Sequence, residues 1–214
     1  MKIALIDYRA GNLTSVKKAF AALGADLFVP PEPADLRDAA AVVVPGVGHF
    51  AATEALADQW TRTIRAGVEA GRPLLGICLG MQWLFEGSEE SPGCEGLGVF
   101  AGRCYRLPSE SNGTSVKIPH VGWNALDVRR VDSIVDGVAP DSQVYFTHSF
   151  VAPTTADTVA VTRHGQAFAS IVQRGRIAGV QFHPEKSGEV GLRILKNFLT
   201  LATVLPFCLW PFAF

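Results

Sequence analysis

Hydrophobic and polar positions follow different patterns in the two halves of the chain. Before residue 86, short apolar runs bounded by Gly, Pro or charged residues alternate with stretches of helical spacing. We expect strands over residues 2–7, 26–29, 41–44 and 74–77, helices over residues 13–23, 50–56 and 60–70, and another helix from Met81. This strict alternation predicts a parallel sheet wound with helices.

After residue 85 the pattern changes to short β-like segments separated by turn residues. They cover residues 98–106, 115–119, 123–129, 143–147, 158–163, 168–173 and 176–182. We expect them to extend or flank the main sheet, and a last helix to run from about Gly188 to Leu201. The predicted fold class is therefore α/β, with a mostly parallel central sheet flanked by helices and extra short strands in the second half.

The composition is that of a globular domain. Of 214 residues, 48% are hydrophobic and 18% charged, which excludes an intrinsically disordered chain. The formal net charge is −1 without any block of like charges, so neither nucleic acid nor a membrane is an expected partner. No linker or repeat interrupts residues 1–202, and we expect one domain there.

Cysteine usage and the N-terminus indicate a cytoplasmic protein. Cys78, Cys94, Cys104 and Cys208 form neither a CxxC pair nor a disulfide-framework spacing, as is typical of a reducing cytosol. The first residues form a short apolar strand followed by a charge, which does not match a signal peptide.

Residues 203–214 form an apolar C-terminal extension of unknown role. No charged residue follows Leu199, and Pro206 and Pro211 interrupt the run. A membrane span needs about 20 apolar residues, so this segment is short and broken for one. Packing on its own domain or a partner, a tail anchor, and an exposed extension remain as alternatives.

Cys78 lies where a predicted strand gives way to a predicted helix, with Gly76 before it and Gly80 after it. This G-x-C-x-G spacing is the thiol counterpart of the nucleophile elbow. The start of the helix favours thiolate over thiol, and the N–H of Leu79 is placed to bind an oxyanion. The alternative is a buried structural cysteine in a Gly-rich turn.

His183 is the best candidate for the base that a cysteine nucleophile requires. It ends the apolar run 177–182, and Glu185 can turn back to accept the other ring N–H. His148 is the rival base, although it has no carboxylate close by in sequence. A structural His-Pro turn with a solvated Glu185 is the other alternative.

One further motif is a Gly-rich turn, and the sequence shows no metal-ligand spacing. Pro45-Gly46-Val47-Gly48 follows a strand and can supply backbone N–H groups to an oxyanion. His, Cys and carboxylates show no metal-ligand spacing, and no phosphate-binding loop is present, so we expect neither metal nor cofactor.

Together these motifs resemble the class I (triad) glutamine amidotransferases over nearly the whole chain. Residues 76–82 are similar to the nucleophile motif of that family, and residues 181–185 to its His-x-Glu motif. Within the class, residues 117–124, 146–150 and Met81 resemble the glutaminase subunits of imidazole glycerol phosphate synthase.

The resemblance implies a mechanism and a set of site residues. Cys78 would attack the side-chain amide of glutamine while His183, oriented by Glu185, moves the proton that releases ammonia. Water would then hydrolyse the thioester to glutamate. The implied oxyanion groups are Leu79 N–H and the backbone of Gly46 and Val47. The implied ligands of glutamine's amino-acid end are Gln82, Glu90, Ser149 and Phe150.

The resemblance also implies a partner, a (β/α)₈-barrel cyclase subunit that receives ammonia and works in histidine biosynthesis. The chain has no room for a second active site that uses ammonia. The positions implied at this interface are Asn12, Trp123, Tyr145 and Lys186. Arg9-Ala10 stands where that family often has a smaller or Pro-containing turn, so the resemblance does not extend to the fine detail of the interface. Core packing is the alternative for Trp123.

Three other functions compete with this interpretation. The chain could be the glutaminase of another synthase, against which Met81 and residues 117–124 argue. It could be a catalytically dead binding module, against which Cys78, His183 and Glu185 argue. A cysteine hydrolase or peptidase that acts without a partner is the third.

Overall fold

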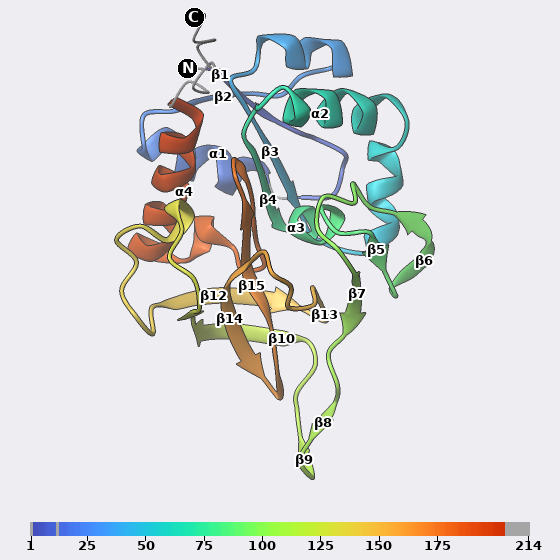
Figure 1. Ribbon diagram of the computed structural model, residues 1–214, viewed down its shortest axis with the longest axis vertical. Helices are drawn as coiled ribbons and strands as arrows, with labels where there is room; N and C mark the ends of the chain where they lie inside the picture. Colours follow the sequence, from blue (N-terminus) through green and yellow to red (C-terminus); the bar gives the residue numbers. More distant parts are fainter. Residues whose placement is uncertain (1, 12, 204–214) are drawn as a thin grey trace, which may run out of the picture.

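An eight-stranded sheet forms the centre of the computed structural model, which describes residues 2–11 and 13–203 (Figure 1). Its strands, in spatial order, are β11 (Asp127–Val128), β14 (Thr158–His164), β15 (Gln166–Arg174), β16 (Ile177–Val180), β4 (Leu74–Cys78), β3 (Ala41–Gly46), β1 (Lys2–Leu5) and β2 (Asp26–Phe28). Neighbours from β16 to β2 are parallel, whereas those from β11 to β16 are antiparallel.

Helices and smaller sheets surround this sheet. The α-helices are α1 (Leu13–Ala22), α2 (Gln59–Glu69), α3 (Leu79–Trp83) and α4 (Gly188–Thr203), and the 3₁₀ helices are η1 (Pro33–Asp38), η2 (Phe50–Leu56), η3 (Ser133–Val135) and η4 (Pro184–Lys186). The smaller sheets contain β5 (Gly87–Ser88), β6 (Ser91–Glu95), β7 (Arg103–Arg106), β8 (Glu110–Ser111), β9 (Thr114–Ser115), β10 (His120–Ala125), β12 (Gln143–His148) and β13 (Phe150–Val151).

The parallel strands are covered on both faces. Every residue of β3 and β4 is buried, and alternate residues of these strands enter two different hydrophobic clusters. Val43 and Ile77 pack with residues of α1 and α4, whereas Val44 and Leu74 pack with residues of α2 and α3. Continuous apolar runs form these strands because neither face of the sheet meets water.

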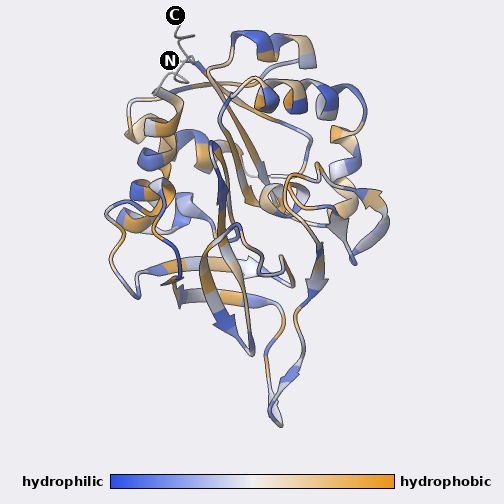
Figure 2. Cartoon of the chain, viewed as in Figure 1, coloured by the Kyte–Doolittle hydropathy of each residue, from blue (hydrophilic) through white to orange (hydrophobic). Residues whose placement is uncertain are grey.

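In the second half, β15 and β16 are buried on both faces, whereas the antiparallel ribbon of β10 and β12 is buried on one face only. Buried and less buried residues alternate along β12, which pairs with β10 in a separate two-stranded sheet. Figure 2 shows apolar and polar residues mixed along this ribbon, and Val144 and Phe146 are the buried apolar residues of β12. The pairing places Trp123 opposite Tyr145.

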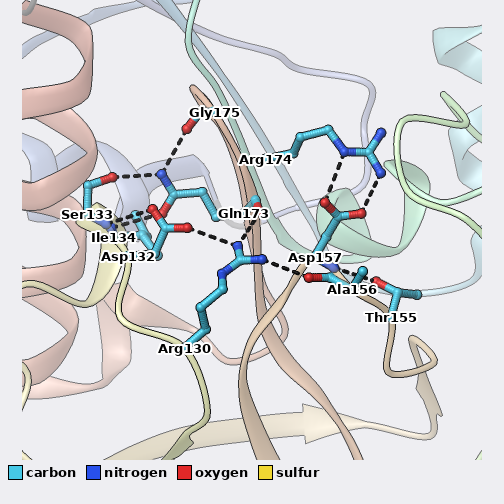
Figure 3. A network of polar contacts seen from close by, with 10 residues as sticks. All are labelled: Arg130, Asp132, Ser133, Ile134, Thr155, Ala156, Asp157, Gln173, Arg174 and Gly175. Atoms are coloured by element: carbon cyan, nitrogen blue, oxygen red, sulfur yellow. Dashed lines mark hydrogen bonds and ion pairs between the residues drawn. The ribbon is translucent and has the colours of Figure 1, made fainter.

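Buried polar contacts connect this half internally (Figure 3). The Gln173 amide accepts the Ile134 N–H at 3.0 Å and donates to Ser133 Oγ at 2.7 Å and to Gly175 O at 2.8 Å. Arg130 donates to the Gln173 carbonyl at 2.6 Å. These contacts hold η3 against the end of β15.

The predicted fold class is confirmed. In the first half, the helix expected over residues 50–56 is the 3₁₀ helix η2, and η1 was not predicted. Most other differences concern the short segments of the second half. Only Arg103–Arg106 of the segment 98–106 is a strand, because Gly98 and Gly102 take positive φ values. The segment 115–119 holds a strand only at its first residue, and Pro119 cannot donate to a ladder. The hairpin of β5 and β6 was not predicted because it is rich in Gly, Ser and Pro.

Two predictions fall partly outside the described residues. Asn12 lies outside them, and so does the extension apart from Thr203, the last residue of α4. Among the described residues, no helix has the length and apolar character needed to cross a membrane.

Candidate active site

Cys78 lies in the tight turn that the spacing of Gly76 and Gly80 predicts. Its φ of 53° is in the left-handed region, which is uncommon for a residue with a side chain and typical of a nucleophile elbow. A Cβ on Gly76 would lie 2.6 Å from Gly80 O, and a Cβ on Gly80 would lie 1.8 Å from Val44 O. Both glycines are therefore required by backbone packing.

The helix that begins beside the sulfur is short. α3 contains only five residues, Leu79–Trp83, and all five are buried. The predicted helix start is present, but only about one turn of aligned peptides lies behind Cys78, so its dipole is smaller than that of a long helix.

His183 and Glu185 form the predicted contact. His183 Nδ1 lies 2.8 Å from Glu185 Oε1, and both side chains are 3% exposed. Burial alone would lower the pKa of His183, but the hydrogen bonds and charges of Cys78 and Glu185 outweigh it and raise this pKa to about 10. The raised pKa favours a protonated imidazole, which Glu185 orients through its contact with Nδ1.

The position of His183 is fixed by its backbone and by Ser187. The His183 N–H donates to Tyr145 O at 2.9 Å, and Ser187 Oγ donates to His183 O at 2.6 Å. Ser187 Oγ also accepts the Tyr145 N–H at 3.0 Å. The base is therefore attached to β12, in the second half of the chain.

His148, the rival base, has both ring nitrogens in use. Nδ1 lies 3.1 Å from Phe150 O and Nε2 lies 3.1 Å from His120 Nδ1. A carbonyl only accepts, so Nδ1 donates and Nε2 accepts from His120. Burial first and His120 second lower the pKa of His148 to about 3. This histidine shapes the site and is not placed to take a proton from Cys78.

The residues expected at the oxyanion lie next to Cys78, but one N–H is directed elsewhere. Gly46 pairs with Cys78 in the register of β3 and β4, and Leu79 follows the nucleophile directly. The Val47 N–H donates to Ala10 O at 2.8 Å. In this conformation it does not face a substrate bound at Cys78.

The residues expected to bind substrate lie on two sides of the elbow. Gln82 is buried in α3, and its Nε2 donates to Phe150 O at 2.9 Å, beside the half-buried Ser149. Glu90 is half-buried, and its Oε2 accepts the Phe50 N–H at 2.7 Å, at the start of the 3₁₀ helix that follows the Gly-rich turn. The fold thus connects each of these side chains to a loop that borders Cys78.

Three of the residues expected at the interface form one exposed cluster. The Trp123 and Tyr145 rings meet edge to face with centroids 6.1 Å apart, and Lys186 Nζ lies 5.8 Å from the Tyr145 centroid. Trp123 is 57% exposed, which excludes core packing. Lys186 also lines a cavity of about 20 Å³ with Val47 and His183, which connects this cluster to the active site.

Two residues of the site were not predicted, Gln181 and Tyr8. Gln181 Nε2 lies 3.6 Å from Cys78 Sγ. Tyr8 is buried with an unpaired hydroxyl, which would lie 1.9 Å from a Cβ on Gly46. Burial first and Cys78 second raise the pKa of Tyr8. The sequence could have indicated Gln181 as a site residue, because it is a glutamine between two apolar residues at the end of a strand. The position of Tyr8 after a strand gives no such indication.

The comparison with protein families agrees with this fold and site. The model of the class-I glutamine amidotransferases matches residues 4–202. The chain therefore belongs to the class-I glutamine amidotransferases.

Within that class, several relatives carry the same name. The imidazole glycerol phosphate synthase subunit HisH of Syntrophotalea carbinolica is 44% identical over 92% of this chain and 98% of that protein. The HisH subunit of Methanopyrus kandleri is 46% identical over 95% of this chain and 100% of that protein. The chain is a member of this HisH group.

Solved structures share the fold at low identity. A glutamine amidotransferase crystal structure matches with a TM-score of 0.72 at 22% identity, over 94% of this chain and 99% of that chain. PurLQS from Thermotoga maritima matches with a TM-score of 0.71 at 17% identity, over 93% and 97% of the two chains.

Proposed function

We propose that this chain hydrolyses the side-chain amide of glutamine through a thioester on Cys78. The single observation that carries this proposal is the buried contact of 2.8 Å between His183 Nδ1 and Glu185 Oε1, behind a cysteine in a strained elbow. A cysteine nucleophile needs such an oriented base, and the class of the protein supplies the substrate.

The reaction balances with these three side chains and one water. The Cys78 thiolate attacks the amide carbon of glutamine, and the carbonyl oxygen becomes an oxyanion that the Leu79 N–H stabilises. His183 then gives its proton to the leaving nitrogen, the C–N bond breaks, and ammonia leaves. His183 next takes a proton from water, whose oxygen attacks the thioester and releases glutamate and the thiolate.

Glutamine would be held by its amino-acid end. Nε2 of Gln82 is already a donor to two acceptors, so its Oε1 is the atom left to accept from the substrate ammonium. Glu90 and the segment Ser149-Phe150 complete the proposed ligands. We assign these roles within a single domain, residues 1–202.

Ammonia would pass to a partner, a (β/α)₈-barrel cyclase subunit that makes imidazole glycerol phosphate and an aminoimidazole carboxamide ribonucleotide in the cytoplasm. Two observations support this. The relatives are named as subunits of a synthase. The exposed cluster of Trp123, Tyr145 and Lys186 also has the aromatic and cationic character of an interface anchor, and it lies next to the active site. Asn12 is assigned to the same interface from the sequence alone.

The test is glutamate release from glutamine, measured for the chain alone and with the cyclase subunit and its nucleotide ligand. We expect a large rise only in the full mixture, and its loss in Cys78→Ala. Full activity without the partner would instead indicate an independent hydrolase, and no activity in either case would reject the proposal. Cys104→Ala is the matched control, because Cys104 is a buried cysteine outside the triad.

Activation by the partner would act on the Gly46-Val47 peptide. Rotation of this peptide would release the Val47 N–H from Ala10 O and direct it at the oxyanion. Gly48, with φ of 100°, is the adjoining pivot, and a Cβ there would meet nothing within 4 Å. Gly48→Ala therefore strains the pivot without a clash, and we expect it to change the ratio of activated to basal activity. An unchanged ratio would reject the rotation.

A further inference from the structure

Gln181 is a buried polar residue that the mechanism above does not use. β16 ends at Val180, which pairs with Ile77 of β4 in parallel register, so the next residue of each strand brings Gln181 beside Cys78. Gln181 is 0% exposed. A primary amide at this depth must have hydrogen-bond partners, because leaving its donors and acceptor unpaired is costly.

The partners of this amide determine how it is oriented. The Phe150 carbonyl can only accept, so the group of Gln82 that lies 2.9 Å from it is the nitrogen. The same nitrogen lies 3.1 Å from the Gln181 amide, whose facing atom is therefore the oxygen. The Gln181 nitrogen must then face the Cys78 sulfur, at 3.6 Å.

An N–H donor at the sulfur favours the reactive form of the nucleophile. The thiolate accepts a hydrogen bond strongly and the thiol only weakly, so a fixed donor stabilises the charged form. An uncharged amide has no proton to transfer and does not compete with His183. Because Gln82 holds the far end of the amide, the donor cannot turn away from the sulfur.

We propose that Gln181 is a positioning residue for the nucleophile, whose Nε2–H holds the Cys78 sulfur and stabilises the thiolate, and that Gln82 fixes this orientation. The inference rests on the proposed role of Cys78. It also assigns Gln82 a second task, which connects the Ser149-Phe150 segment to the reacting sulfur.

The test is the pH dependence of Cys78 alkylation by iodoacetamide in the full-length chain, followed by site-resolved mass spectrometry. Gln181→Met keeps a similar volume and removes the donor. We expect alkylation of Cys78 at pH 7 to fall about tenfold and the midpoint of the profile to rise by about one pH unit. With the partner present, kcat should fall by a similar factor while KM changes little.

Gln173→Met is the matched control. Gln173 lies on the neighbouring strand β15, opposite Ala178 of β16, is 2% exposed and has a fully bonded amide (Figure 3), but none of its bonds reaches Cys78. This variant should lose stability and keep the alkylation profile of the wild type. An equal shift of the alkylation midpoint in both variants would mean that loss of stability alone changes the reactivity of Cys78. That result would overturn the proposal.

Gln181→Glu is a second variant for the case that the methionine variant does not fold. It keeps the size of the side chain and an oxygen for Gln82, but it places a second acceptor at the sulfur. Alkylation at pH 7 should fall further than in Gln181→Met. A profile identical to the wild type in either folded variant would reject the proposal.

The alkylation assay also separates this inference from the proposed function. It requires neither glutamine nor partner, so a wrong substrate would leave its outcome unchanged. Gln82→Met, which frees the amide of Gln181, should shift the profile in the same direction by a smaller amount. If it shifts nothing, Gln82 does not orient Gln181.

Discussion

The two halves of the central sheet differ in strand direction and in how they are covered. From β16 to β2 the strands are parallel, covered on both faces by helices, and packed so closely that Gly80 lies against the backbone of β3. From β11 to β16 they are antiparallel, and the flanking ribbon of β10 and β12 leaves Trp123 exposed. The first half holds the nucleophile in a closely packed turn, whereas the second contains the exposed surface that we propose as the partner interface.

The active site lies at the border between these halves. β16 is parallel to β4 and antiparallel to β15, so it belongs to both. Cys78 ends the parallel strand, and His183 follows β16 and is bonded to Tyr145 of the ribbon. The base is therefore connected to the ribbon, and the nucleophile to the parallel strands.

The largest effect is expected from breaking the packing of the parallel half. In Gly80→Ala the new Cβ would lie 1.8 Å from Val44 O, a backbone atom that cannot give way cheaply. We expect the free energy of unfolding to fall by about 3 kcal/mol in urea denaturation. Gly93→Ala, whose Cβ would meet nothing within 4 Å, should change it by less than about 0.5 kcal/mol. Equal losses would contradict the difference in packing.

In the exposed ribbon, a substitution should weaken partner binding and leave the stability of the chain nearly unchanged. Trp123→Ala should leave the unfolding transition of the isolated chain nearly unchanged, because Trp123 is 57% exposed. Binding of the cyclase subunit should weaken about 30-fold in a titration, the loss of about 2 kcal/mol that is typical of a central aromatic anchor. Val131→Ala, at a position 95% exposed and outside the cluster, should bind as the wild type does.

We expect acid to destabilise the fold through the ribbon of β10 and β12, which contains His120 and His148. Burial lowers the folded-state pKa values of His120 and His148 to about 4 and about 3, from about 6.5 in the unfolded chain. These neutral histidines stabilise the folded chain above pH 6.5, and this contribution is lost as the pH falls toward 4. The loss is about 1.4 kcal/mol for each unit by which the folded-state pKa lies below the unfolded-state pKa.

Urea unfolding at pH 7 and pH 5 measures this loss. His148→Asn keeps a donor for the Phe150 carbonyl but does not titrate, so its stability should depend less on pH than that of the wild type. His49→Asn, at the exposed cap of η2, should keep the acid dependence of the wild type. A variant of His148 as acid-sensitive as the wild type would place the titration elsewhere.

The smallest effect concerns Tyr8, at the edge of the parallel half. Its hydroxyl is buried without a partner, so Tyr8→Phe should leave the free energy of unfolding unchanged or raise it by about 1 kcal/mol. Tyr105→Phe loses a hydrogen bond to Gln166 and should be destabilised by about 1 kcal/mol. Destabilisation of Tyr8→Phe would show that the hydroxyl finds a partner in solution.

Local patterns determined much of the fold and the reacting residues. Apolar runs predicted the four strands of the first half. β1, β3 and β4 are buried on both faces, whereas β2 is a half-buried edge strand. Gly76, Cys78 and Gly80 are two residues apart, as are His183 and Glu185, so their geometry follows from a few backbone angles. The short polar strands around residues 87–95 gave no such pattern, because turn residues rather than side-chain periodicity form them.

Contacts between distant segments were decided by the tertiary structure alone. The sequence contained Gln181, Gln82 and Phe150, but only the register of β16 on β4 and the position of β13 bring them together at the sulfur. The bond from Val47 to Ala10 and the pairing of Trp123 with Tyr145 are of the same kind. Periodicity shows which face of a strand is buried, whereas strand order and register determine which distant side chains meet there.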